Sequence, residues 1–237
     1  MKFTMPFEPM TIEHLGLRLY STLPPVIAEF LSNSYDAESG EVHVTVPTGP
    51  ITEESAVVVR DFGHSLSPSE IQDQFLPIGR SRRGEGGDRV MSKNGKVRVT
   101  GRKGLGKLSA FGVATEMEVR FIQKGKACCL LLNYDSMKQW PKDHPGAAYE
   151  PEIVEGKCGS TDDPDGVELT LKRLHRKNRI NVDELRKSIA RRLSLTGGAF
   201  GVLINGIPIQ PGDRMQREKC PEGFSWDVAE LPAGASV

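Results

Sequence analysis

The chain has 237 residues, of which 38% are apolar and 26% are charged, and its 31 basic residues balance its 31 acidic residues. This composition excludes the disordered and the transmembrane classes of protein and supplies enough apolar side chains for a sizeable core. No apolar run approaches the roughly 18 residues that a membrane helix needs, and the first residues lack the pattern of a signal peptide. We therefore expect a globular protein of the cytoplasm without a membrane partner.

Two helices are predicted near the start of the chain. The first spans residues 11–20, and the second begins at Pro24 and Pro25, since prolines are tolerated in the first turn of a helix. In the second helix the apolar residues recur at helical spacing. Three polar residues lie beside them on an adjacent stripe: Glu29, Asn33 and Asp36.

Two strands and a short helix follow. Residues 41–47 alternate valine with polar residues, and residues 55–60 contain three consecutive valines. These patterns predict a half-buried strand and a buried strand. The buried strand ends at Asp61, and Gly63 follows two residues later. Residues 67–75 begin with the serine, proline and glutamate of a capping box and predict a helix.

A basic, glycine-rich stretch comes next. Residues 80–107 contain ten lysines and arginines but two acidic residues. Because the stretch is also poor in apolar side chains, it predicts a mobile loop that faces phosphate, either of a nucleotide or of nucleic acid. A solvated loop without a ligand is the alternative that charge alone leaves open.

The second half of the chain predicts mostly neighbouring strands. Residues 138–165 are rich in proline, glycine and aspartate and predict mainly a loop, with one strand near residues 149–154. The other predicted elements are a hairpin of strands 116–122 and 126–133, a strand at 166–171, a basic helix at 183–195 and a second hairpin that begins at residues 199–204. Helices and adjacent strands in this order predict an α+β sandwich, with helices on one face of an antiparallel or mixed sheet.

The polar stripe of the second helix suggests the hydrolysis of a phosphate compound. A carboxylate at Glu29 could position and deprotonate an attacking water, and Asn33, one turn further, could offer its amide oxygen to a Mg²⁺ ion that bridges phosphate oxygens. Asp36 could hold the waters of that metal or make a capping contact. Each residue alone is typical of a solvated helix, so the prediction depends on their combination.

Asp61 and Gly63 suggest a site for a base. Asp61, at the end of a buried strand, could accept a hydrogen bond from an exocyclic amine, and the missing side chain of Gly63 would let a flat base approach the backbone. An ordinary turn at the end of a strand is the alternative.

The glycines at the end of the basic stretch suggest a site for an anion. Gly101, Gly104 and Gly106 precede a short predicted helix and would offer backbone amides, with Lys107 as an added positive charge. The stretch does not match a Walker A loop, because Leu108 stands where that motif has its metal-binding hydroxyl.

In this order and spacing, the motifs resemble those of the GHKL superfamily of ATPases, which includes gyrase-type topoisomerases, ninety-kilodalton heat-shock chaperones, histidine kinases, MutL and MORC proteins. Residues 29–37 resemble the E-x-x-x-N-x-x-D-A helix, residues 61–65 the D-x-G-x-G turn, and residues 101–107 the G-x-x-G-x-G segment. Residues 165–170 stand where the family has its fourth motif, a G-T-x-V strand.

The resemblance implies a Bergerat fold, an α+β two-layer sandwich of a mixed, mostly antiparallel sheet with helices on one face and a mobile ATP lid at about residues 76–100. It implies ATP and Mg²⁺ as cofactors, Glu29 as the general base, Asn33 as the metal ligand and Asp61 as the reader of the adenine amino group. Lys107 is the second catalytic candidate, acting on the γ-phosphate. The cofactor-binding residues that it implies are Asn33, Asp36, Asp61, Gly63, Gly101, Gly104, Leu105, Gly106, Lys107, Leu108 and Thr170.

Two positions depart from the family pattern. Ser65 replaces the second glycine of the D-x-G-x-G turn at residues 61–65, here called the adenine turn. Val167 replaces the usual threonine of the fourth motif. Thr170 is the candidate substitute for that threonine. The departures predict a relaxed specificity for the base.

The sequences of residues 101–111 and 200–209 are similar to those of bacterial MutL/MORC-like ATPases. We expect residues 1–172 to form the ATP-binding domain and residues 173–237 a helix-plus-hairpin extension, as at the start of a transducer-like domain. The resemblance implies a slow Mg²⁺-dependent ATPase that acts as a nucleotide-gated dimerisation switch in DNA maintenance or phage defence, with ATP, ADP, a second copy of the chain, and DNA or a separate effector as partners. Two alternatives remain open: a nucleotide sensor that does not hydrolyse, and a nucleic-acid-binding protein that uses its basic residues.

Overall fold

The structure, a computed structural model, describes residues 2–6, 22–78, 91–97, 106–193 and 200–214. The predicted helix at 11–20, most of the predicted lid, and Gly101, Gly104 and Leu105 lie outside this part of the chain. Among the described residues, no helix has both the length and the apolar character that crossing a membrane requires.

A nine-stranded sheet forms the centre of the molecule, in the order β5-β4-β3-β7-β2-β1-β8-β9, with β6 paired to β4. All pairs of neighbouring strands are antiparallel except β1 and β8, which are parallel. The strands are β1 (Glu41–Thr45), β2 (Val57–Asp61), β3 (Ala114–Gln123), β4 (Lys126–Asn133), β5 (Glu152–Ile153), β6 (Gly159–Ser160), β7 (Gly166–Leu174), β8 (Gly201–Ile204) and β9 (Ile207–Pro208).

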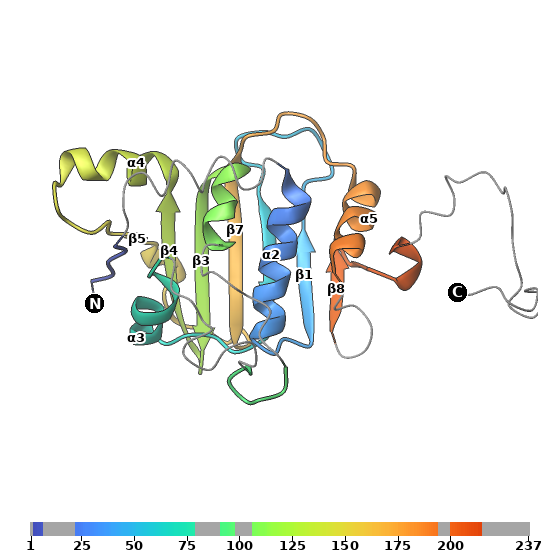
Figure 1. Cartoon of the computed structure of the whole chain (residues 1–237), viewed down its shortest axis with the longest axis horizontal. Helices are drawn as coiled ribbons and strands as arrows, with labels where there is room; N and C mark the ends of the chain where they lie inside the picture. The colour runs from blue at the N-terminus through green and yellow to red at the C-terminus, as the bar shows by residue number, and fades with distance from the viewer. Residues whose placement is uncertain (1, 7–21, 79–90, 98–105, 194–199, 215–237) are drawn as a thin grey trace, which may run out of the picture.

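Helices cover one face of this sheet (Figure 1). Helix α2 (Leu23–Asp36) packs against α5 (Val182–Arg192) on one side and against the 3₁₀ helix η3 (Gly106–Gly112) on the other. The other helical segments are α3 (Pro68–Glu70), the π-helical turn η1 (Ile71–Phe75), α4 (Tyr134–Asp143), and the 3₁₀ turns η4 (Glu155–Lys157) and η5 (Pro211–Arg214). The predicted two-layer α+β sandwich with a mixed, mostly antiparallel sheet is confirmed.

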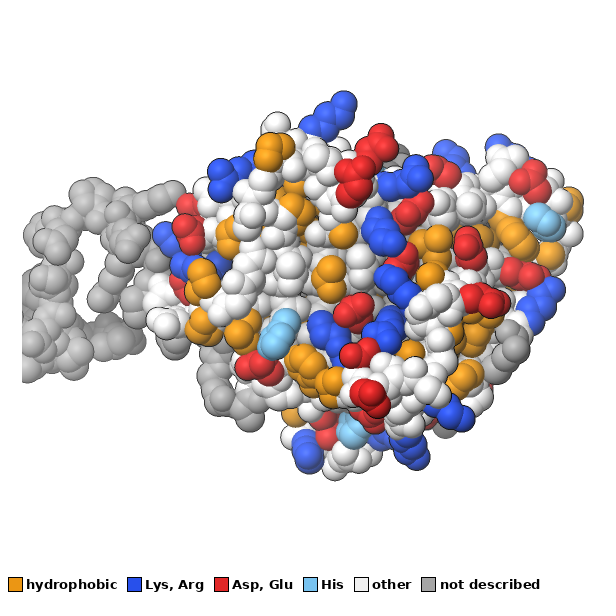
Figure 2. Space-filling model, turned by 180° about the vertical axis from the view of Figure 1, so that it is seen from behind, with side chains coloured by type: hydrophobic (Ala, Val, Ile, Leu, Met, Phe, Trp, Pro, Cys, Tyr) orange, Lys and Arg blue, Asp and Glu red, His pale blue; other side chains and the backbone are white. Residues whose placement is uncertain are grey.

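The alternation of side chains along the strands separates the two faces of the sheet. In β2 the buried residues are Val57, Val59 and Asp61, which share the face of the helices with Val42 and Val44 of β1. The intervening residues point to the opposite face, where the register places His43, Arg60, Glu168 and Arg120 side by side across β1, β2, β7 and β3. Figure 2 shows basic and acidic side chains gathered over this second face, which we call the open face.

Several local predictions are confirmed. Helix α2 begins with prolines in its first turn, and Ser67 and Glu70 form both hydrogen bonds of the capping box. The predicted hairpin turns at residues 124–125 and 205–206 have positive φ at both positions, 51° and 71° in the first and 48° and 79° in the second. Two consecutive positive φ angles are typical of the turn that joins twisted antiparallel strands.

The predicted strand near residues 149–154 is present as β5, but the predicted loop of residues 138–165 was wrong at its start, because α4 occupies residues 134–143. Asn133 caps this helix by accepting a hydrogen bond from the amide of Ser136 at 2.9 Å, and Met137 is completely buried. The cap and the burial of Met137 stabilise the helix although Pro141 lies inside it.

The segment after residue 172 continues the same layers. Strand β8 pairs with β1, and α5 packs against α2. Helix α5 and strands β8 and β9 therefore extend the helical layer and the sheet of the first part of the chain. That residues 173–237 begin a transducer-like domain stays a prediction.

Candidate functional site

Asp61 is the centre of the candidate site. Its side chain lies at the end of β2, faces α2 and is buried, with 6% of the residue exposed. The carboxylate accepts hydrogen bonds from the amides of Gly63 and Val167 and from the hydroxyl of Ser34, each at 3.1 Å. An ionised carboxylate has about four acceptor sites, so these three donors fix its orientation and leave one site for a ligand.

Burial raises the pKa of the Asp61 carboxyl above its ordinary value, although the three hydrogen bonds and the nearby Arg60 guanidinium act in the opposite direction. A buried acceptor of this kind interacts more strongly with a donor than an exposed carboxylate does. The arrangement suits a ligand that presents an N–H group, such as the amino group of adenine.

Ser34 and Val167 were not singled out as partners of Asp61 in the sequence. Ser34 lies on α2 directly after Asn33, and Val167 contributes its backbone amide, so its side chain gave no signal. The contact between Val167 and Asp61 joins residues 106 positions apart. Only the pairing of β2 with β7 brings them together.

The structure gives Gly63 a packing reason that the sequence did not indicate. A Cβ atom there would lie 2.5 Å from the carbonyl oxygen of Ala37, closer than two such atoms can approach. The amide of the next residue, His64, donates to the same carbonyl at 2.7 Å. Gly63 therefore lets the adenine turn pack against the end of α2, and its contact with a base stays a prediction.

The predicted polar stripe lies on α2 as expected. Glu29 and Asn33 are partly buried, and Asp36 is buried at the end of the helix. Glu29 contacts the start of η3, because a Cβ atom on Gly106 would lie 2.5 Å from the Glu29 Cγ atom. The absence of a side chain at Gly106 thus leaves room for the Glu29 carboxylate beside η3.

Lys107 and Leu108 have other surroundings than predicted. The Lys107 ammonium donates to the carbonyl oxygen of Phe75 and, at 2.8 Å, to that of Pro77. The Leu108 side chain is completely buried in the core, so only its backbone could contact a ligand. A role of Lys107 on a γ-phosphate stays a prediction, and it requires the ammonium to leave these carbonyls.

Thr170 lies on the wrong face of the sheet for the predicted role. It pairs with Val58 of β2 and Glu118 of β3, both of which point to the open face. Asp61 points to the helical face, and Thr170 is three residues along the strand from Val167, about 10 Å away. Thr170 therefore does not replace the missing threonine beside Asp61, and the prediction is corrected.

Part of the predicted lid is held by a residue that the sequence did not indicate. Glu38, just after α2, has φ of 59° and a side chain that is 4% exposed. Its carboxylate accepts hydrogen bonds from the Ser92 hydroxyl at 2.6 Å and the Asn94 amide at 2.9 Å, and it lies 3.2 Å from His64 Nε2. The hydrogen bond from Ser92, followed by those from Asn94 and His64, outweighs desolvation and lowers the pKa of Glu38 to about 2.

A cavity borders the turn at residues 61–65. It has a volume of about 880 Å³ and is lined by residues that include Glu38, Gly63, His64, Ser65, Gln123 and Lys124. Glu29, Asn33 and Asp61 do not line it. The cavity therefore does not reach the buried Asp61 carboxylate or the polar stripe of α2, and Glu29 lies instead against Gly106 at the start of η3.

The residues present fit a magnesium ion that is carried by a nucleotide. Within the described part of the chain, no cluster of three acidic, histidine or cysteine side chains could enclose a metal. Asn33 lies one turn from Glu29 on α2. Its side-chain amide has no hydrogen-bond partner among the described residues. Mg²⁺ is commonly held by one or two protein oxygens together with phosphates and waters, and Asn33 could supply such an oxygen.

A sequence model of the family described as "Histidine kinase-, DNA gyrase B-, and HSP90-like ATPase" matches residues 20–159, which is more than half of the chain. The chain therefore belongs to this family, the GHKL superfamily, and its sandwich is the Bergerat-like fold of that family. Membership implies that the domain binds ATP.

A curated relative from Herpetosiphon aurantiacus carries the name "Putative type II restriction enzyme HgiDII". It is 26% identical over 216 residues, which make up 90% of this chain. They make up 33% of the relative, so the chain spans about a third of the length of that protein.

Proposed function

We propose that this domain binds Mg²⁺–ATP, hydrolyses it slowly, and uses the bound nucleotide to control association with a second copy of itself. The observation that supports the proposal most strongly is the Asp61 carboxylate, held by three donors on the helical face beside the Glu29–Asn33 stripe. Family membership supports ATP as the ligand.

In the proposed mechanism, different side chains bind the base, hold the metal at the phosphates and activate the water. Asp61 accepts a hydrogen bond from the adenine amino group and thereby fixes the base. Asn33 offers its amide oxygen to the metal, which would neutralise phosphate charge when bound. Glu29 orients the attacking water and removes its proton as the water oxygen bonds to the γ-phosphorus and the bond from that phosphorus to the bridging oxygen breaks, releasing ADP. Gly106 lies against Glu29, so a displacement of η3 would move the proposed general base directly.

The setting that we propose is a bacterial DNA-maintenance or phage-defence system of MutL/MORC-like type. The name of the Herpetosiphon relative supports a connection with DNA, and the greater length of that relative supports an output domain outside this chain. The ATPase would then report nucleotide state to an effector that cuts, repairs or marks DNA.

Direct binding of nucleic acid is the second candidate. The last turn of α5 carries Arg191 and Arg192, both exposed, and Arg186 and Lys187 lie earlier in the same helix. A salt-sensitive affinity for duplex DNA would support this function, and nucleotide-dependent affinity would link it with the first.

Replacement of the base-reading carboxylate tests ATP binding. Asp61→Asn puts an amide among the donors at this position and removes the charged acceptor, so the dissociation constant for ATP should rise about tenfold or more. Calorimetry with ATP should detect the loss, and Asp135→Asn, on the exposed first turn of α4, is the matched control. Equal ATP affinity for Asp61→Asn and wild type would disprove the assignment of the base site.

A further inference from the structure

We infer that Arg60, on the open face of the sheet, is a positioning residue for adenine recognition: it holds the loop before β7 so that the Val167 amide reaches Asp61. The inference rests on the proposed function, in which Asp61 reads the amino group of ATP. Arg60 is the neighbour of Asp61 in β2, but the two side chains point to opposite faces.

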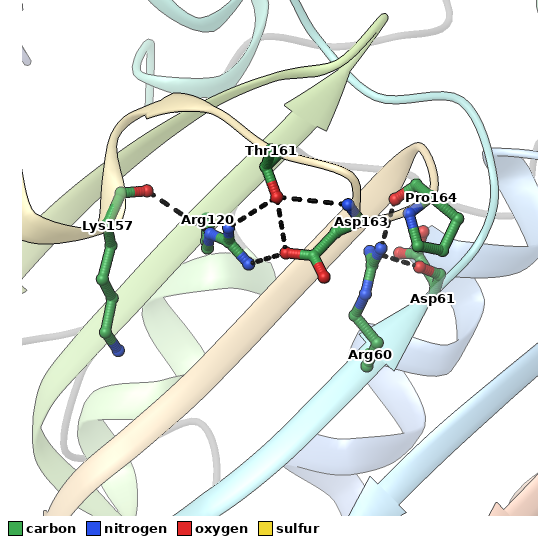
Figure 3. Close-up of polar contacts among 7 residues, drawn as sticks. All are labelled: Arg60, Asp61, Arg120, Lys157, Thr161, Asp163 and Pro164. Carbon is green, nitrogen blue, oxygen red and sulfur yellow. Dashed lines mark hydrogen bonds and ion pairs between the residues drawn. The ribbon is translucent and has the colours of Figure 1, made fainter.

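The guanidinium of Arg60 joins two segments that are far apart in the sequence. Its Nη1 atom donates to the carbonyl oxygen of Asp61 at 2.6 Å, and its Nη2 atom donates to the carbonyl oxygen of Pro164 at 2.5 Å (Figure 3). The Phe62 ring lies 4.9 Å from the guanidinium and restricts it further. One planar group with two fixed donors thus ties the end of β2 to the loop of residues 161–165.

A second arginine fixes the same loop from the open face. Arg120 of β3 donates to the Asp163 carboxylate at 2.7 Å and to the carbonyl oxygen of Lys157 at 3.3 Å. The Thr161 hydroxyl donates to the same carboxylate at 2.9 Å (Figure 3). The loop therefore has anchors at both of its ends, and the Arg60 anchor is the one nearer to Asp61.

The loop leads directly into the contact with Asp61. Gly166 follows it with φ of 141°, and a Cβ atom there would lie 2.6 Å from Arg60 Nη1 and still closer to the Asp61 carbonyl oxygen. The next residue, Val167, donates its amide to the Asp61 carboxylate at 3.1 Å. Only three positions separate the carbonyl that Arg60 holds from the amide that orients the reader of the base.

This path explains how the site is fixed without the usual threonine. At position 167 the chain has valine, whose side chain offers no hydrogen bond. The backbone amide of Val167 donates the hydrogen bond instead. Its position depends on the position of the loop that precedes it. Arg60 places that loop from the far side of the sheet, where it does not touch the ligand.

The test is the preference for ATP over inosine triphosphate, which carries an oxygen in place of the amino group. The ratio of the two dissociation constants isolates the base edge, because both ligands have the same sugar and phosphates. Arg60→Ala should reduce this preference about fivefold or more by loosening one hydrogen bond to Asp61. Arg60→Lys, which keeps the charge but not the planar fork, should reduce it less and serves if the alanine variant fails to fold.

Arg173→Ala is the matched control. Arg173 pairs with Glu116 at 2.9 Å, near the other end of β7 and away from the loop of residues 161–165. This variant should keep the wild-type preference. In an Asp61→Asn background, Arg60→Ala should no longer change the preference, since the residue acts through Asp61.

The outcomes separate the two claims. If wild type binds no ATP, both the proposed function and the inference are wrong. If wild type binds ATP and inosine triphosphate equally well, Asp61 does not read the amino group, and the inference is wrong while ATP binding stands. If wild type prefers ATP and both folded Arg60 variants keep that preference, or weaken both nucleotides equally, the positioning role is wrong while the proposed function stands.

Discussion

The two faces of the sheet use the same strands for different tasks. On the helical face, β2 presents two valines and Asp61 to α2, and the one charged group is held by three neutral donors. On the open face, the charged side chains mostly pair with each other, as Glu118 does with Lys157 and Lys172. A charge without a charged partner is costly to bury, so its presence on the helical face points to a ligand, whereas the pairs on the open face stabilise the fold.

The largest effect is expected at Gly166, which packs closely against both Asp61 and Arg60 at the end of β2. In Gly166→Ala a Cβ atom would collide with the Asp61 backbone and the Arg60 guanidinium, and alanine rarely adopts the φ of 141°. The variant should lose about 3 kcal/mol or more of the free energy of unfolding and should bind ATP weakly. Thermal unfolding and ATP titration measure both effects.

Gly156→Ala is the control for that experiment, because a Cβ atom there would meet nothing within 4 Å. It should unfold at nearly the wild-type temperature. A Gly166→Ala variant that is equally stable would show that the close packing between the end of β2 and the start of β7 is absent.

Loss of an ion pair on the open face should lower the free energy of unfolding by less and should leave the candidate site intact. Burial raises the pKa of Glu118, but the hydrogen bonds and charges of Lys157 and Lys172 outweigh it and hold the pKa below 4.5. Glu118→Gln should lower the free energy of unfolding by about 1–2 kcal/mol at pH 7, without a change in ATP affinity.

The pH dependence has a definite sign. A carboxyl with a lowered folded pKa contributes stability above its unfolded pKa and loses it as the pH falls through the folded value. The difference in stability between wild type and Glu118→Gln should therefore shrink below pH 4.5. Glu155→Gln, an exposed change on η4, should show no such difference at any pH.

The smallest effect should be local, at the described part of the predicted lid. Glu38→Gln weakens the hydrogen bonds to Ser92 and Asn94 but leaves both faces of the sheet unchanged. Hydrogen exchange of residues 92–97 should accelerate several-fold, while the exchange of β2 and β7 stays the same. Unchanged exchange in residues 92–97 would show that Glu38 does not hold this segment.

Local patterns predicted much of the fold and part of the site. The spacing of α2, the valine runs of β1 and β2 and the capping box at Ser67 each depend on residues close in sequence, and the structure has them all. The period of two along a strand could also have excluded Thr170, because residues three apart in β7 point to opposite faces.

The other parts depend on contacts between distant segments. The hydrogen bond from the Val167 amide to Asp61 forms only when β2 and β7 pair. The hydrogen bonds from Ser92 and Asn94 to Glu38 form only when their segment reaches the end of α2. No local pattern marks an amide such as that of Val167, or an arginine such as Arg60 that works from the other side of the sheet.

The central claim is that ATP binding at α2 controls association, and one measurement tests it directly. The molar mass in solution and the released phosphate should be measured together for wild type and Glu29→Ala, with Mg²⁺ and with or without ATP. ATP should produce a dimer of wild type that releases phosphate slowly, and Glu29→Ala should remain a dimer with ATP and release none. A monomer under every condition would show that ATP does not control association, and phosphate release by Glu29→Ala at the wild-type rate would show that Glu29 is not the general base.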